Sequence, residues 1–158
     1  MLQKAKRGFT LVEILIVVII LGILAAIVIP QFSGASQEAK TSSLVSTLQT
    51  LRSQILLYKL QHSDSLPDIT TKWDALTATS TDPAAPGKTF GPYMQAAPKN
   101  PLNGLDTVTN ATVTVDADTG VASWSGTATG FVYDYGTSGD GTGRIWGTNK
   151  DGTALAAE

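Results

Sequence analysis

The most conspicuous residue chemically is Glu13, a single carboxylate inside a long apolar run. From Phe9 to Ile29 it is the only ionisable side chain among 21 residues. A carboxylate in hydrocarbon costs several kcal/mol unless a partner compensates its charge. Two opposite charges that are each costly alone become tolerable as a pair, so ion pairing is the chemistry that Glu13 predicts. The alternative is a carboxylate that reaches back to the interface, because Glu13 lies only one helical turn into the run.

The other candidate residues do not predict catalysis. His62 is the only histidine, and the chain has no cysteine. A Ser-His-Asp arrangement would have to use His62, which falls at a predicted helix end with no nucleophile elbow or oxyanion loop beside it. One histidine without cysteine does not make the usual zinc ligand set, and disulfides are excluded. The sequence therefore predicts a protein that is not an enzyme.

The apolar run around Glu13 predicts a membrane span. At about 1.5 Å per residue, residues 9–29 form a helix of about 31 Å, enough to cross a hydrocarbon core of about 30 Å. Lys4, Lys6 and Arg7 precede the run, which places the N-terminus on the cytoplasmic side. A secretory signal peptide is the alternative, but it needs a shorter apolar core and a small-residue cleavage site, which residues 24–26 imitate poorly.

The start of this run carries a specific resemblance. Gly8-Phe9-Thr10-Leu11-Val12-Glu13 follows a basic leader and precedes an apolar helix with a proline at Pro30. This pattern resembles the signature of type IV pilins and of the pseudopilins of type II secretion, over about the first 60 residues. In that family a membrane peptidase cleaves after the glycine, here Gly8, and methylates the new amino group, here on Phe9. The resemblance also implies that this amine pairs with Glu13 of a neighbouring subunit in a filament.

The resemblance implies an α+β, pilin-like fold with one long N-terminal helix packed on a small C-terminal antiparallel sheet. Residues 1–8 would be a cleaved leader, residues 9–30 the membrane and filament-core half of the helix, and residues 31–62 its amphipathic half. Gly22 and Pro30 weaken a helix, and the resemblance implies local melting between them. The amphipathic half has an apolar stripe at steps of four and three, which predicts a face packed on the sheet: Leu44, Leu48, Leu51, Ile55 and Tyr58.

Residues 63–106 predict a short helix followed by a connecting loop. The helix is expected over residues 70–78, with Trp73 and Leu76 in the core. Proline recurs in the loop, where the residue before each proline is biased to extended geometry. The segment 91–101 resembles the connector that major pseudopilins carry between helix and sheet.

Residues 107–158 predict the sheet, because the hydrophobic period changes to two. Residues 111–115 and 121–124 predict one hairpin, and residues 131–135 and 144–146 predict a second pair of strands around a glycine-rich turn. Antiparallel strands with one apolar face need a cover, and the helix stripe is expected to supply it.

Calcium is the one metal that the sequence leaves open. Residues 116–120 begin like an EF-hand loop, but Thr127 stands where the bidentate glutamate is required, so a hairpin turn explains them better. Asp134 and Asp140 flank the later glycine-rich turn. Major pseudopilins bind calcium in a C-terminal loop between strands, and the resemblance implies a calcium site at these two carboxylates. No other cofactor is predicted.

The overall prediction is a structural subunit of a type IV pilus-like filament, most like the major pseudopilin of a type II secretion system. It implies a single-pass protein of the bacterial inner membrane that becomes a periplasmic or extracellular homopolymer. The implied partners are a prepilin peptidase, an assembly ATPase and inner-membrane platform proteins. The chain has 11 Lys+Arg and 13 Asp+Glu, and three of the basic side chains lie in the leader. The mature chain would lack the basic footprint that nucleic-acid binding requires.

Two other functions stay open. The first is a major pilin of a surface type IV pilus, serving adhesion, motility or DNA uptake. The long sheet region, rich in Thr, Ala and Gly, departs from the pseudopilin pattern and keeps this alternative open. Many such pilins close their C-terminal region with a disulfide, which a chain without cysteine cannot form. The second alternative is a monomeric, membrane-tethered binding module, which would need neither cleavage at Gly8 nor the carboxylate of Glu13.

Overall fold

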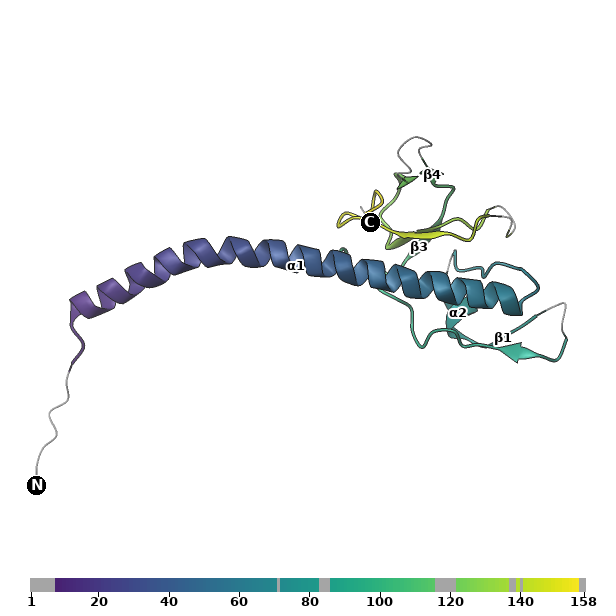
Figure 1. Cartoon of the computed structure of the whole chain (residues 1–158), viewed down its shortest axis with the longest axis horizontal. Coiled ribbons are helices and arrows are strands. Elements are labelled where there is room, and N and C mark those ends of the chain that lie inside the picture. The colour runs from purple at the N-terminus through teal and green to yellow at the C-terminus, as the bar shows by residue number, and fades with distance from the viewer. Residues whose placement is uncertain are drawn as a thin grey trace, which may run out of the picture. The chain divides into compact units, whose positions relative to one another are not determined.

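The structure is a computed structural model, and it divides into two compact units. It describes residues 8–70, 72–82, 86–115, 122–136, 139 and 141–156, without the side chains of residues 32 and 33. One unit is Met1–Ala39 and the other is Lys40–Glu158. The longest element, α1 (Leu11–Gln61), contributes residues to both units (Figure 1). Each unit is described by itself.

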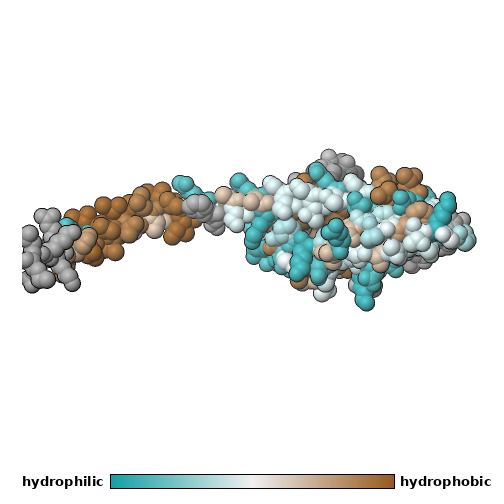
Figure 2. Space-filling model, turned by 90° about the horizontal axis from the view of Figure 1, so that it is seen from below, coloured by the Kyte–Doolittle hydropathy of each residue, from teal (hydrophilic) through white to brown (hydrophobic). Residues whose placement is uncertain are grey.

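The first unit exposes an apolar length of helix in which Glu13 is the single ionisable side chain from Leu11 to Ile29. Every large apolar side chain from Leu11 to Ile29 is at least 42% exposed. Figure 2 shows this part of the helix as a continuous hydrophobic surface. In the described part of the chain, α1 is the one helix long and apolar enough to cross a membrane. A helix that is hydrophobic on all sides requires lipid or other protein around it.

The helix is continuous where the sequence predicted unwinding. Gly22 and Pro30 both lie within α1, and all residues between them are helical. Proline has no N–H, so position 30 cannot donate to the carbonyl oxygen of Ala26. One lost hydrogen bond in a long helix is not enough to interrupt it here. Local melting in a filament stays a prediction.

The second unit has its core between the second half of α1 and the sheet (Figure 1). The predicted stripe is confirmed, because Leu44, Leu48, Leu51 and Ile55 are at most 4% exposed and Tyr58 packs against the same cluster. Their spacing of three and four places them on one face of the helix. The remaining buried members of this cluster come from the loops, the short helix and the sheet: Leu66, Ile69, Trp73, Leu76, Phe131, Tyr133 and Ile145.

The main sheet has three strands in the order β3-β6-β7: β3 is Val108–Asn110, β6 is Phe131–Tyr133 and β7 is Ile145–Gly147. β6 and β7 are antiparallel, which confirms the predicted pair. The predicted α+β architecture, one long N-terminal helix and a small C-terminal sheet, is confirmed. β3 runs parallel to β6, however, so the predicted antiparallel sheet is in fact mixed. Parallel neighbours need a long crossover connection, and the chain between β3 and β6, which holds a hairpin, supplies it.

That hairpin is the one predicted from alternation. Its strands are β4 (Thr114–Val115) and β5 (Ala122–Ser123), which pair antiparallel. Its turn lies outside the described residues.

The segment before the sheet differs from its prediction in two ways. The helix α2 covers only Asp74–Thr77, not residues 70–78. The carboxylate of Asp68 accepts hydrogen bonds from the Thr70 amide and hydroxyl at 3.1 and 2.7 Å, and such a turn competes with helix. A second small sheet pairs β1 (Ser80–Thr81) with β2 (Thr89–Phe90) antiparallel, and these two-residue strands carry no sequence pattern.

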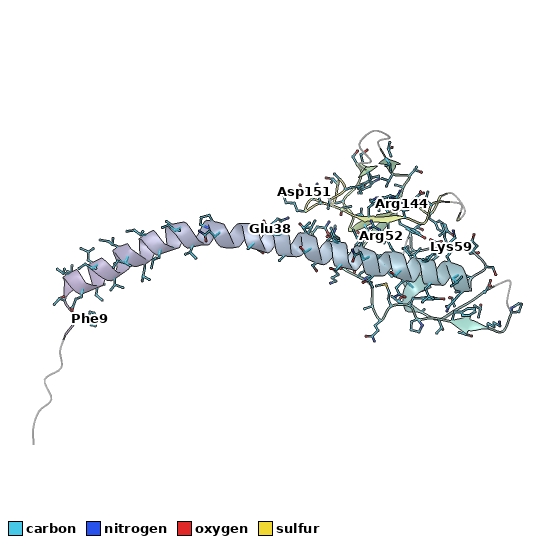
Figure 3. All side chains as sticks on the ribbon, in the orientation of Figure 1. Phe9, Glu38, Arg52, Lys59, Arg144 and Asp151 are labelled. Carbon is cyan, nitrogen blue, oxygen red and sulfur yellow. The ribbon has the colours of Figure 1, made fainter. Side chains whose placement is uncertain are left out.

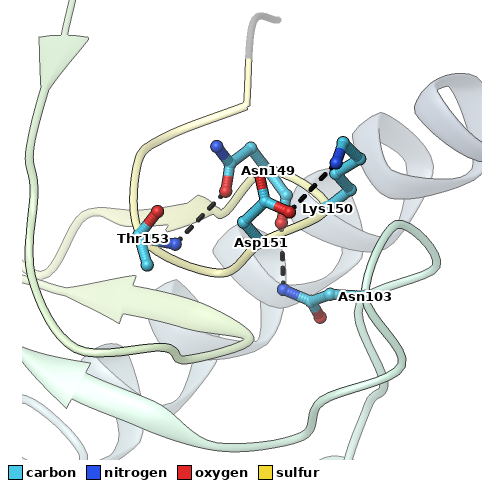
Figure 4. Close-up of polar contacts among 5 residues, drawn as sticks. All are labelled: Asn103, Asn149, Lys150, Asp151 and Thr153. Carbon is cyan, nitrogen blue, oxygen red and sulfur yellow. Dashed lines mark hydrogen bonds and ion pairs between the residues drawn. The ribbon is translucent and has the colours of Figure 1, made fainter.

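Two asparagines hold the connecting loop against the sheet. The buried Asn100 side chain donates to the carbonyl oxygens of Gly130 and Thr148, both at 2.8 Å. Asn103 donates to the carbonyl oxygen of Asn149 at 3.1 Å (Figure 4). These bonds satisfy carbonyl groups that would otherwise be costly to bury, and they fix the loop after α2 to the chain around β6 and β7.

Strand β6 is buried on both faces. Phe131 and Tyr133 face the helix, whereas Val132 belongs to a second cluster with Val113 and Trp146. The hydroxyl of Tyr133 is buried and has no hydrogen-bond partner among the described residues. Burial, with smaller contributions from nearby Tyr and Asp groups, raises the pKa of Tyr133 well above its usual range. The fold therefore holds this phenol in its neutral form.

Tyr133→Phe is expected to stabilise the protein and to reduce its alkaline sensitivity. Removing an orphan hydroxyl gains about 1 kcal/mol at neutral pH. Burial raises the pKa of Tyr133 in the folded chain above its unfolded value of about 10. The ionisation of Tyr133 therefore leaves the free energy of unfolding unchanged below pH of about 10 and lowers it as pH rises from there through the folded value. Urea midpoints of the full chain in detergent at pH 8 and pH 11 measure both effects. An unchanged alkaline loss in the variant would contradict the assignment.

Candidate functional site

The candidate site is the start of α1, where Thr10 and Glu13 form a capping box. The Thr10 amide and hydroxyl donate to Glu13 Oε2 at 2.9 and 2.7 Å. The Glu13 amide in turn donates to Thr10 Oγ1 at 3.3 Å. These reciprocal bonds satisfy backbone donors that a helix start leaves without partners. They also explain why the helix begins at Leu11.

This capping role of Glu13 was not predicted from the sequence, although the signal was present. A threonine followed three residues later by a glutamate, before an apolar run, predicts a helix start. The capping role does not exclude ion pairing, since a carboxylate has about four acceptor positions and both donations from Thr10 go to one oxygen. Glu13 can therefore cap its own helix and still accept a charged amine.

Gly8 and Phe9 lie just before the helix. Phe9 is 77% exposed, and a Cβ on Gly8 would meet no other atom within 4 Å. Exposed chain outside regular structure is where peptidases reach the backbone. The geometry is compatible with cleavage between these residues, and the cleavage itself stays a prediction.

The described residues do not form a calcium site on their own. Asp134 is buried, and its Oδ2 accepts hydrogen bonds from the Thr142 amide at 3.2 Å and hydroxyl at 2.6 Å. Within the described ranges, no group of three His, Cys, Asp or Glu side chains could hold a metal ion. Asp140, the other predicted ligand, lies outside the described residues. The structure thus gives Asp134 a structural role, joining the two ends of the β6–β7 connection.

Asp134→Asn is expected to lower the free energy of unfolding by about 1 to 2 kcal/mol, because an amide oxygen accepts the two hydrogen bonds from Thr142 more weakly than a charged carboxylate does. The loss should be the same with EDTA and with millimolar calcium if the bonds to Thr142 are its only cause. Thermal unfolding of the full chain in detergent under both conditions measures it. A loss that appears only with calcium would instead make Asp134 a ligand.

His62 is buried at the end of α1 and has a packing role. Its ring stacks on Tyr58 with centroids 3.9 Å apart, and Nδ1 lies 3.0 Å from the carbonyl oxygen of Tyr58. Nε2 lies 2.9 Å from the hydroxyl of Ser80. The hydroxyl of Ser63 donates to the nearby carboxylate of Asp82 at 2.7 Å. In the described chain, the ring nitrogens of His62 contact oxygens of Tyr58 and Ser80 rather than a carboxylate. A Ser-His pair without an orienting acid on the histidine does not reproduce the triad geometry.

Comparison with known proteins bears on the same N-terminal segment. A family model described as the prokaryotic N-terminal methylation motif matches residues 3–29. The type II secretion system core protein G of Klebsiella pneumoniae is 37% identical over 100 residues, which cover 63% of this chain and 71% of that protein. The protein of the same name from Vibrio cholerae is 34% identical over 99 residues, covering 63% of this chain and 67% of its own length. No solved structure matches the chain.

Proposed function

Since the chain belongs to the family of the type II secretion system core protein G, we propose that it polymerises into a secretion pseudopilus through its apolar helix. One observation carries this proposal. Every large apolar side chain from Leu11 to Ile29 is at least 42% exposed, although the second unit has a closed core. Such a surface is stable only in lipid or among other apolar helices. Lipid covers it before assembly, and the helices of other copies cover it afterwards.

Processing comes first in the proposed sequence of events. The chain inserts with its N-terminus in the cytoplasm, and a prepilin peptidase cleaves between Gly8 and Phe9 and methylates the new amine. This creates a positive charge at the edge of the apolar layer. The carboxylate of Glu13 on a neighbouring copy is its partner, because an ion pair lowers the cost of placing both charges in hydrocarbon.

Assembly then exchanges lipid contacts for helix packing. In membranes, helix association depends on close packing and polar contacts rather than on the hydrophobic effect. Gly22 and Pro30 are the points where α1 can unwind to fit its neighbours, since each weakens the helix locally. The proposal includes an assembly ATPase and inner-membrane platform proteins as partners. It assigns the chain no enzymatic activity.

The mass of the native N-terminus tests this function. Protein purified from its host membrane is expected to start at N-methylated Phe9, and its filaments are expected to be short and confined to the envelope. Retention of Met1 in a singly dispersed protein would support the membrane-tethered binding module instead. Long extracellular fibres would support a surface pilus, which the relatives named for type II secretion disfavour.

A further inference from the structure

A pocket of about 400 Å³ opens in the second unit, between α1 and the connection that leads into β7. Three cationic side chains line it: Arg52 and Lys59 from α1, and Arg144 from the connection (Figure 3). Ile55, Leu56 and Leu66 supply its apolar lining. No carboxylate is among its described lining residues. We call it the basic pocket.

The cations of the basic pocket are held in place by the protein. Nη2 of Arg52 donates to the carbonyl oxygen of Ile145 at 3.1 Å. The guanidinium of Arg144 lies over the ring of Trp146, 5.3 Å from its centroid, a geometry that attracts a cation without neutralising it. Lys59 Nζ lies 3.5 Å from the carboxylate of Asp64, whose side chain is 87% exposed. Such an exposed ion pair is weak, so Lys59 can exchange Asp64 for another carboxylate.

The apolar part of this surface extends beyond the pocket. Leu56 and Leu60 are 67% and 80% exposed, one turn apart on α1. Large apolar side chains exposed beside converging cations fit a partner with apolar and acidic groups side by side. A nucleic acid would satisfy the charges but not the leucines.

We propose that the basic pocket docks a carboxylate side chain and its apolar neighbours on a second copy of this chain. The proposal rests on the proposed function, because polymerisation brings other copies to this surface at high effective concentration. The charge balance fits as well. The chain has 13 Asp+Glu against 11 Lys+Arg, and Lys4, Lys6 and Arg7 precede the predicted cleavage site. A neighbouring copy thus presents an excess of carboxylates to a pocket that concentrates three of the remaining cations.

The first experiment replaces Leu56 by a photo-crosslinking amino acid in the full chain. Irradiation of assembled filaments is expected to give crosslinked copies, with the attached peptide containing Asp or Glu. The same probe at Lys88, an exposed residue outside the pocket, is the control and should give far fewer such products. Crosslinks only to a different protein, or none in intact filaments, would overturn the proposal.

The second experiment reverses charge. The double variant Lys59→Glu with Arg144→Glu is expected to lower filament yield at least tenfold, whereas Lys59→Arg with Arg144→Lys should stay within about twofold of wild type. N-terminal cleavage should be unchanged in both. The thermal midpoint should fall only slightly in the double reversal, because the lost contacts with Asp64 and Trp146 contribute little to stability. Normal yield from the double reversal would refute docking here and leave the proposed function intact. Failure of the wild-type chain to form filaments would instead refute the proposed function.

Discussion

Glu13→Val is expected to insert in the membrane and to be cleaved normally, yet to assemble at least about 100-fold less efficiently than wild type. Removing one member of a buried ion pair costs about 3 to 5 kcal/mol, because the other charge is left without compensation. Each 1.4 kcal/mol is about a factor of ten in an equilibrium. Filament yield relative to the cleaved membrane pool is the measurement.

Two further variants separate the charge of Glu13 from its capping role. Glu13→Gln keeps an acceptor for Thr10 but loses the charge, so it should fail to assemble as Glu13→Val does. Thr10→Val removes the two capping bonds of the hydroxyl and keeps both the backbone amide bond to Glu13 and the charge. It should cost about 1 kcal/mol of helix stability and leave assembly close to wild type. Full assembly of Glu13→Gln would show that the cap, not the ion pair, is what filaments need.

Gly8→Leu is expected to leave essentially all of the protein as an uncut precursor. Gly8 has no side chain and lies in exposed chain before the helix, so a peptidase can bind the backbone closely, whereas a leucine places a bulky side chain at the cleaved bond. Intact mass of the membrane-extracted protein reports the result directly. Because the amine of Phe9 never forms, filaments should be absent as well.

Gly22→Leu is the matched control for this variant. It introduces the same side chain at another glycine, inside the apolar part of α1, where a Cβ meets nothing within 4 Å. Cleavage of Gly22→Leu should match wild type. Efficient cleavage of Gly8→Leu would remove Gly8 from the processing site.

The sequence predicted the elements that have long periodic patterns. The stripe from Leu44 to Tyr58 repeats over four helical turns, so its burial could be predicted from residue spacing alone. The strands around Phe131 and Ile145 were also found, since alternation over several residues is distinctive. In each case the pattern lies within one segment of the chain, and the apolar face of that segment packs against the apolar face of the other.

The missed features depend on contacts between distant segments. Nothing in the residues of β3 indicates that it pairs in parallel with β6 rather than antiparallel with a neighbour in sequence. The bonds from Asn100 to the carbonyls of Gly130 and Thr148 span 30 and 48 residues. The link from Asp134 to Thr142 requires a turn whose shape the sequence does not specify. The capping box of Thr10 and Glu13 is the exception. Its two residues are three positions apart, so it could have been predicted from the sequence.

A reconstruction of the assembled filament would locate the carboxylate of Glu13, on which the proposed assembly depends. We expect the methylated nitrogen of Phe9 to lie within about 3 Å of the Glu13 carboxylate of another copy, a distance typical of charge-assisted hydrogen bonds. A filament in which Glu13 contacts only Thr10 of its own chain, with the amine bound elsewhere, would contradict the ion pair.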